Sequence, residues 1–269
     1  MPKFMEVLTF HIKGKFAHFR KFHGNNTAMS YSIPPRTTII GILAAVLGEE
    51  NDTYYQKFRT EKLLVGVRVL EDLKKSFHRL NYLKITSRND FTGQSGRIQT
   101  PFEIVTAYDL KRDLVCYKIY LAAGKDPALY DNLKNQLLSD KRTFNISLGI
   151  AGFSAFISEV ESVDVTPIHA DSEWVDLHSA CNSDQVLKID FPEDPEIKFN
   201  HIEEELLPAD FIGGEKGREV YRMNRVLFAT RPFPIHVKLD GTYYQLPGTS
   251  NESENIQFLE YASVLTQPN

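Results

Sequence analysis

The feature that most constrains the fold of this chain is a run of eight residues, Leu114 to Leu121 (L-V-C-Y-K-I-Y-L), which predicts a central β-strand. Such a strand needs neighbouring strands on its edges and covering layers on its faces. The surrounding sequence provides both. Patterns of apolar residues predict strands over residues 4–12, 63–70 and 77–85 and helices over residues 38–47 and 127–138.

The order of these elements, β-α-β-β-β-α over the first 140 residues, resembles a ferredoxin-like or RRM-type sandwich, so we expect an α+β fold. The second half predicts only strands, over residues 160–165, 185–189, 218–229, 235–239 and 242–245. We therefore divide the chain into an RRM-like domain, residues 1–150, and a smaller β-rich C-terminal region, residues 151–269. Two polar segments, residues 86–99 and 190–205, are expected to be irregular and mobile.

Charge is distributed unevenly along the chain, although the net charge of −4 by itself argues against a nucleic-acid binder. The 42 residues between Glu6 and Glu49 contain no Asp or Glu, whereas an even spread would place about five there. Residues 74–100 and 216–238 each carry a net charge of +5, and residues 171–215 carry −11. The basic segments suit a polyanionic ligand; the alternative is that they are ordinary solvated faces.

The acid-free segment contains the first candidate RNA-binding side chains, namely Lys15, His18, Arg20, Lys21 and His23. Phenylalanines alternate with these residues, a composition that lets a chain pair with phosphates while stacking on bases. The same phenylalanines also suit a hydrophobic core, because alternate residues of a strand face opposite sides.

Two further segments are candidate anion sites. One is the N-terminus of the helix expected near residue 38, where free N–H groups, the helix dipole, Arg36 and the hydroxyls of Thr37 and Thr38 converge. The alternative there is an ordinary helix capped by Thr37 or Thr38. The other is the glycine-rich run at residues 213–218, in which Lys216 and Arg218 flank backbone groups able to bind phosphate, unless it is a plain hairpin turn.

Several classes of chemistry lack a sequence signature. The chain has no phosphate-binding loop of the Gly-x-x-x-x-Gly-Lys-Ser/Thr type, no dinucleotide-binding fingerprint and no complete nucleophile elbow. Its eight histidines are scattered and its two cysteines are far apart, so we expect no metal, no cofactor and no disulfide framework. No apolar run is long enough to span a bilayer, so we expect a cytoplasmic protein without membrane contact.

Two consecutive stretches of the N-terminal region carry a family resemblance. Residues 13–21 (K-G-K-F-A-H-F-R-K), followed by residues 30–43 (S-Y-S-I-P-P-R-T-T-I-I-G-I-L), resemble the N-terminal signature of the fifth family of CRISPR-associated (Cas) proteins, in the RAMP superfamily. Weaker agreement continues to about residue 160, and the pattern is most similar to the type I-B branch.

This resemblance implies a non-catalytic subunit of the surveillance complex Cascade that holds the 5′ handle of the crRNA. It implies contacts with the backbone subunit and the large subunit, and only indirect contact with target DNA. It also implies a hairpin, the thumb, that inserts between nucleotides; residues 74–112 are the candidate, with Arg88, Phe91 and Arg97 near its tip. Tyr31 and Ser32, which lie within the signature, join the candidate RNA contacts.

Two alternative functions stay open at this point. Type I-C members of the resembled family cut precursor crRNA without a metal, which requires general acid–base side chains near one phosphate. His18, Lys21, His23 and Tyr31 are residue types able to do this, so we name no catalytic residue and leave an endoribonuclease as the second hypothesis. The third is an RNA-independent scaffold, which differs from an RNA binder in showing no salt-dependent RNA affinity.

Overall fold

A computed structural model describes residues 4–22, 27–85, 87–191, 201–214, 217–247 and 253–259. The strands of its largest sheet are β1 (Met5–Gly14), β4 (Leu63–Val69), β7 (Val115–Ala123), β8 (Ala155–Leu177), β10 (Val186–Ile189), β13 (Ile235–Leu246) and β14 (Glu254–Ile256). They run in the order β10-β13-β8-β1-β7-β4, with β14 added to β13, and every pairing is antiparallel. The structure is therefore strand-rich α+β, as expected.

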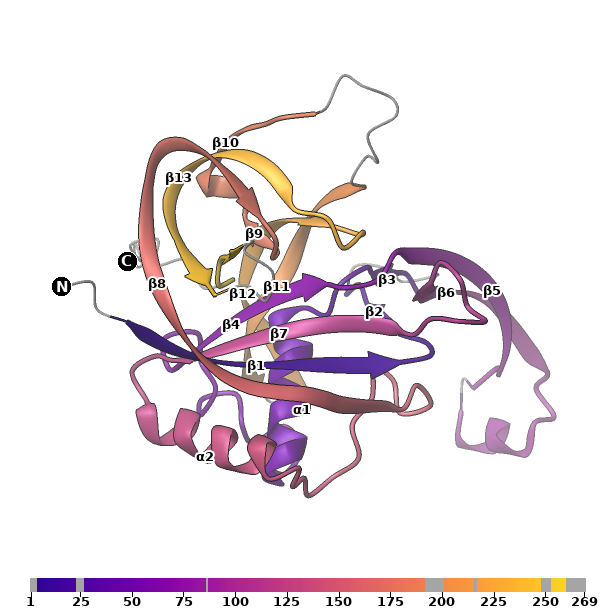
Figure 1. Ribbon diagram of the computed structural model, residues 1–269. Helices are drawn as coiled ribbons and strands as arrows, with labels where there is room; N and C mark the ends of the chain where they lie inside the picture. Colours follow the sequence, from indigo (N-terminus) through magenta and orange to yellow (C-terminus); the bar gives the residue numbers. More distant parts are fainter. Residues whose placement is uncertain are drawn as a thin grey trace, which may run out of the picture.

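Two helices, α1 (Arg36–Leu47) and α2 (Pro127–Leu138), cover one face of this sheet (Figure 1). The predicted central strand is β7, which lies between β1 and β4 and is almost completely buried. On β1, Leu8, Phe10 and Ile12 point toward the helices and belong to the main hydrophobic core, whereas Val7 belongs to a smaller cluster on the opposite face. Among the described residues, neither helix is long and apolar enough to cross a membrane.

The start of α1 differs from the expectation. The helix begins at Arg36, after Pro34 and Pro35, so Thr37 and Thr38 lie in its first turn and neither caps it. Pro35 is the N-cap residue, and no side chain accepts a hydrogen bond from the first turn. The expected end is confirmed: Gly48 adopts a left-handed conformation with φ +78°, which favours glycine at a helix C-terminus.

A long hairpin extends away from the main sheet. It consists of β5 (Leu73–Leu83) and β6 (Arg97–Ala107), which pair only with each other in a separate two-stranded sheet. The predicted strand at residues 77–85 overlaps β5 but begins four residues late and ends two residues beyond it, and β6 was not predicted, since residues 86–99 were expected to be irregular. In the structure a short 3₁₀ helix (Arg88–Thr92) forms the tip and β6 starts at Arg97; Thr86 lies outside the described residues.

The second half of the chain is β-rich, as expected, but its strands are longer than predicted. β8 runs without interruption through 23 residues, and β13 replaces two predicted strands with one. A strand that was not predicted, β11 (Ile202–Gly214), pairs with β12 (Gly217–Ala229), which pairs with β9 (Cys181–Asn182). Part of the expected loop, residues 192–200, lies outside the described residues.

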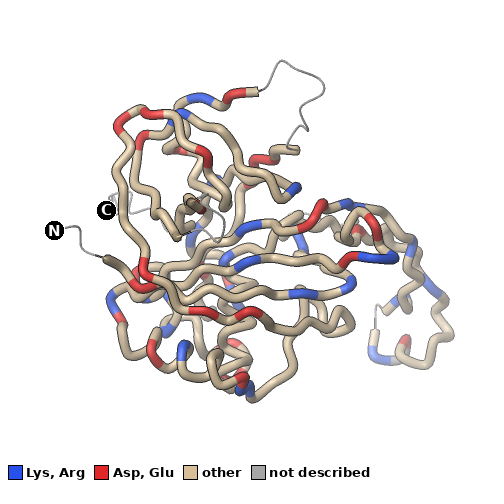
Figure 2. Tube along the Cα trace, viewed as in Figure 1, with Lys and Arg blue, Asp and Glu red and all other residues tan. Residues whose placement is uncertain are grey.

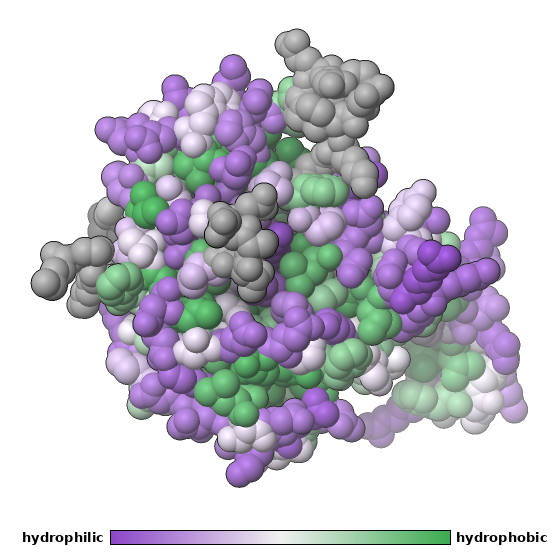
Figure 3. All heavy atoms as spheres, viewed as in Figure 1, coloured by the Kyte–Doolittle hydropathy of each residue, from purple (hydrophilic) through white to green (hydrophobic). Residues whose placement is uncertain are grey.

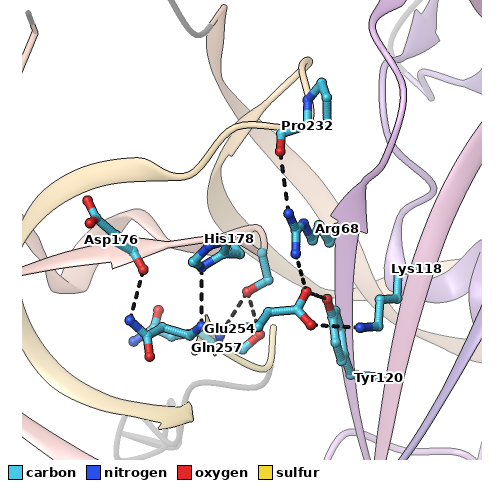
Figure 4. Close-up of polar contacts among 10 residues, drawn as sticks. Arg68, Lys118, Tyr120, Asp176, His178, Pro232, Glu254 and Gln257 are labelled. Atoms are coloured by element: carbon cyan, nitrogen blue, oxygen red, sulfur yellow. Dashed lines mark hydrogen bonds and ion pairs between the residues drawn. The ribbon is translucent and has the colours of Figure 1, made fainter. Parts of the chain in front are cut away.

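The C-terminal segment, residues 253–259, joins the two halves of the chain (Figure 4). Glu254 on β14 forms ion pairs with Arg68 on β4 and Lys118 on β7. The Tyr120 hydroxyl also donates a hydrogen bond to this carboxylate. Farther along, the Gln257 backbone N–H donates to the Ser179 hydroxyl at 2.8 Å. Residues from β4, β7 and the β8–β9 connection are thus held by β14 and the residue that follows it.

Candidate nucleic-acid interface

A groove of about 550 Å³ lies along α1 from Thr37 to Ala45. Its walls are formed by residues 18–22, which include β2 (Phe19–Arg20), by the loop at residues 145–150, and by the far end of the β11–β12 hairpin. Thr37, Thr38 and Gly41 lie along α1 on its floor. The groove therefore brings together four segments that are far apart in the sequence.

The N-terminus of α1 makes one end of this groove favourable for an anion. A helix leaves its first N–H groups without intrahelical partners, and its dipole places partial positive charge there. In α1 no side chain caps these groups and the first turn contains no acidic residue. The Thr38 N–H already donates to the Pro35 carbonyl oxygen at 2.9 Å, but Thr37 and Thr38 line the groove at this turn, so a phosphate there would meet their hydroxyls and the positive end of the helix dipole.

Two arginines approach the groove from different walls. Arg20 is exposed on β2, and Arg218 is exposed near the tip of the β11–β12 hairpin. The Arg218 guanidinium lies over the ring of Phe211, 5.2 Å from its centroid, which directs this long side chain toward the groove wall that Phe211 also forms. The structure thus assembles Arg20, Thr37, Thr38 and Arg218, all named from the sequence, around a single concavity.

His18 also lines the groove, but its imidazole is buried. The residue is 1% exposed, and its ring stacks on Phe102 with centroids 4.1 Å apart. Nδ1 lies 2.7 Å from the backbone carbonyl oxygen of Glu103, which can only accept, so Nδ1 carries the hydrogen. Burial lowers the pKa of His18, although the carbonyl of Glu103 partly opposes this. The side chain is therefore held neutral, and it does not add a positive charge to the groove.

Four side chains assigned to RNA from the sequence are instead bonded to β11. The Arg36 guanidinium, only 2% exposed, pairs with Asp210 at 2.9 Å. The Tyr31 hydroxyl donates to the carbonyl of Leu206 at 3.1 Å. Ser32 donates to Glu203, and Lys21 pairs with Glu205. These polar groups are buried or part-buried and already bond to protein, so the RNA contacts predicted for Arg36, Tyr31, Ser32 and Lys21 stay predictions that the geometry of the groove does not support.

These contacts explain the uneven charge of the sequence. Carboxylates of β11, within the acidic block at residues 171–215, neutralise cations of the acid-free N-terminal segment. Lys75 on β5 also pairs with a carboxylate of β11, since its Nζ lies 3.6 Å from Glu203. Only part of the basic character seen in the sequence is therefore presented to solvent.

The remaining N-terminal candidates lie elsewhere. Lys15 bonds to the backbone carbonyl of Leu110 and lies 3.4 Å from that of Asp113, and it does not line the groove. His23 and Lys216 lie outside the described residues. Within the described part of the chain, no group of three or more His, Cys, Asp or Glu side chains could hold a metal ion.

The β5–β6 hairpin presents two different faces. Its register places Arg79 and Leu83 on one face with Gln99 and Arg97, and Leu80 and Tyr82 on the other with Thr100 and Ile98. The tip is organised by Asp90, whose carboxylate accepts from the Ser87 backbone N–H and from the Ser95 hydroxyl. Phe91 at this tip is 68% exposed.

Cations and apolar side chains thus alternate on an arm that projects from the body of the protein. Figure 2 shows Lys and Arg distributed along the hairpin at the right of the view. Figure 3 shows hydrophilic and hydrophobic surface side by side on the same arm. Arg88 and Arg97, named from the sequence, are both exposed there.

Comparisons with known proteins find similarity to CRISPR-associated proteins, both in sequence and in structure. The family model described as CRISPR-associated protein (Cas_Cas5) matches residues 7–194. A CRISPR protein from Archaeoglobus fulgidus has a similar solved structure, with a TM-score of 0.53, 13% identity, and coverage of 93% of this chain and 99% of that chain. A chain of a CRISPR RNA-guided surveillance complex aligns with a TM-score of 0.46 and 12% identity, covering 86% of this chain and 90% of that one. No curated protein matches the sequence.

Proposed function

Because the chain belongs to the CRISPR-associated Cas5 protein family, we propose that it is a crRNA-binding subunit of Cascade in CRISPR antiviral defence. In this proposal the groove over α1 holds the 5′ handle of the crRNA. The observation that carries it is the convergence of an uncapped helix N-terminus, two threonines and two arginines from three separate segments on one concavity. These are donors of the kind that bind phosphate oxygens.

The architecture supports an RRM-like assignment of the first half. Along the chain β1, α1, β4, β7, α2 and β8 occur in this order, with the β5–β6 hairpin inserted between β4 and β7, and the four strands lie in the order β8-β1-β7-β4. This is the β-α-β-β-α-β arrangement with both helices on one face. β8 begins at Ala155, so the proposed boundary at residue 150 leaves the fourth strand of this unit in the C-terminal region.

The open face of this sheet, which RRM proteins use for RNA, is an unfavourable RNA site here. Its cations already have carboxylate partners: Lys13 pairs with Glu159 at 2.5 Å, and Arg68 and Lys118 pair with Glu254. The groove on the helix side keeps two arginines for a ligand, and it is therefore the site that we assign to RNA.

The β5–β6 hairpin is our candidate for the thumb. Exposed Phe91 at its tip is suited to insertion between bases, and Arg79, Arg88 and Arg97 are suited to the flanking phosphates. The opposite face, with Tyr82 and Ile98 each about half exposed, is suited to contact with a protein subunit. The backbone and large subunits of Cascade are the partners that the family implies, and target DNA is contacted only indirectly.

The experiment that tests this function is incubation of the purified full chain with labelled repeat RNA in EDTA, followed by separation of bound, free and cleaved RNA. We expect retention of intact RNA. Site-specific cleavage that is lost in His18→Ala would overturn the non-catalytic assignment in favour of an endoribonuclease. Absence of any retention, with the protein folded, would favour a scaffold that acts without RNA.

A further inference from the structure

The β5–β6 hairpin has two outer edges, and the body of the protein covers that of β6. Val105 exchanges two backbone hydrogen bonds with Ala17, at 2.8 and 2.9 Å. The Glu103 N–H donates to the carbonyl of Ala28, and the Ala28 N–H donates to the carbonyl of Pro101, both at 2.9 Å. Among the described residues, by contrast, no strand pairs with the outer edge of β5.

Hydrogen bonds at the two ends of the hairpin show which backbone groups of β5 face this outer edge. The Tyr108 N–H donates to the carbonyl of Asp72 at 2.7 Å, and the Lys84 N–H donates to the carbonyl of Gly96 at 3.1 Å. Both contacts continue the β5–β6 register, which has no bulge, so the even-numbered residues of β5 direct their N–H and C=O groups toward β6. Leu73 agrees with this alternation, since its N–H donates away from β6, to the segment that follows β12.

The odd-numbered residues therefore direct their backbone groups outward. From Phe77 to Leu83 they form a row of donors and acceptors about 20 Å long, the length of a typical strand, and these groups make no hydrogen bond to the rest of the described chain. Edge strands are commonly protected by a proline, a bulge or a very short length, and β5 is 11 residues long with neither proline nor bulge. The side chains of Phe77, Tyr82 and Leu83 are 57%, 46% and 43% exposed.

The chemistry of this edge fits a protein strand. A peptide backbone offers N–H and C=O groups at matching intervals, whereas the phosphates of RNA offer acceptors alone and leave the outward carbonyl groups of β5 without donors. A second copy of the chain is an unfavourable partner. β5 carries Lys74, Lys75 and Arg79 and no Asp or Glu, so antiparallel pairing of two β5 strands would bring like charges together.

We propose that the outer edge of β5 is a docking site for an extended segment of a partner protein, which joins the hairpin as a third strand. The segment carries apolar side chains at alternate positions, which cover Phe77 and Leu83, and acidic residues, which complement the cations of β5. The hairpin projects from the body of the molecule, so such a segment can approach its outer edge (Figure 1). This inference goes beyond RNA binding and does not require it.

The test uses a labelled synthetic peptide of about ten residues in which valine and glutamate alternate. Amide hydrogen exchange of the full chain measures docking. In the protein alone we expect the amides of Phe77, Arg79 and Asn81 to exchange at least about tenfold faster than those of the intervening residues, which bond to β6. Saturating peptide should slow exchange at these three amides about tenfold or more. The same peptide with every amide N-methylated should have no effect, because it has no N–H to donate.

Two proline variants locate the docking edge. Asn81→Pro removes an outward N–H of β5 without breaking the β5–β6 ladder, and it should weaken peptide binding about tenfold or more. The control is Gln99→Pro, which lies directly opposite on β6 and removes an N–H from the other outer edge, so its affinity for the peptide should match that of the wild type. The exchange measurement on the wild type decides the question if Asn81→Pro does not fold.

Three results would overturn the inference: no binding of the peptide, binding that leaves exchange at Phe77, Arg79 and Asn81 unchanged, or equal binding by both proline variants. A peptide with lysine in place of glutamate should bind more weakly, and equal affinity would overturn the acidic character of the partner. Protection of the same amides by single-stranded RNA, and not by the peptide, would assign the edge to RNA instead. None of these results alters RNA retention by the groove over α1, so the proposed function fails or holds separately.

Discussion

Glu254 forms ion pairs with Arg68 and Lys118, an arrangement called the clasp below. These contacts allow a quantitative prediction of how Glu254→Gln changes the free energy of unfolding. The carboxylate is 12% exposed, and it contacts the side chains of Arg68, Lys118 and Tyr120 (Figure 4). Burial raises its pKa, but the charges of Arg68 and Lys118 and their hydrogen bonds more than offset this and lower the pKa from its ordinary 4.5 to about 2. That difference corresponds to about 3 kcal/mol of folding free energy at neutral pH.

The pH dependence has a definite sign. Because the folded pKa lies below the unfolded one, the stabilisation is fully present above about pH 4.5 and is lost as the pH falls toward 2. Gln mimics the protonated acid, so the wild type should exceed Glu254→Gln by about 3 kcal/mol at pH 7 and by about 1.4 kcal/mol at pH 3. Urea unfolding at both pH values measures the gap.

The matched control is Glu161→Gln, which neutralises an exposed carboxylate of β8 on the same face of the sheet and should change stability by less than about 0.5 kcal/mol. A gap between wild type and Glu254→Gln that is equal at pH 7 and pH 3 would refute the reasoning. So would a gap below about 1 kcal/mol at pH 7, since the clasp would then contribute no more than a surface ion pair.

Three further predictions concern the groove and the hairpin. Arg36→Ala leaves Asp210 buried without its guanidinium partner, so urea unfolding should show a loss of about 3–5 kcal/mol, and a loss below 1 kcal/mol would contradict the buried pairing. Gly41→Leu fills the groove beside Tyr54, whose hydroxyl would lie 3.3 Å from the added Cβ and must shift, and it should reduce RNA retention; unchanged retention in the folded variant would place the RNA elsewhere. Phe91→Ala should weaken RNA binding by about 1–3 kcal/mol without changing its salt dependence, and a changed salt slope with unchanged affinity would refute stacking at the tip.

The sequence alone predicts the position of those helices and strands whose apolar pattern lies within the element itself. β7, α2 and β12 lie close to where their apolar patterns placed them, and α1 ends at the predicted glycine. β6 and β11 were missed because each contains a proline, Pro101 and Pro208, and β11 also carries three consecutive glutamates, so neither shows a clean apolar alternation; their partners are strands of the same hairpins. Burial of these strands depends on tertiary contacts that a window of sequence does not contain.

Part of the candidate site could also be predicted, because some of its residues carry a local signal in the sequence. Arg20, Thr37, Thr38 and Arg218 were recognised from charge and helix-start signals, and the fold brings them together. The pairing of Arg36 with Asp210 was not predicted because the two residues are 174 positions apart in the sequence. The opposite charges of the N-terminal segment and the acidic block were a visible signal for this pairing.

The central claim is that the groove over α1 binds RNA through phosphate contacts from Arg20 and Arg218. The most direct test is RNA affinity of the full chain as a function of salt, for the wild type and for the double variant Arg20→Ala/Arg218→Ala. The double variant should bind more weakly and lose about 1.4 from the slope of log K against log salt, about 0.7 per phosphate contact on a single strand. Lys188→Ala, which removes an exposed cation of β10 outside the groove, should match the wild type. Equal affinity and equal slope in the double variant and the wild type would contradict the claim.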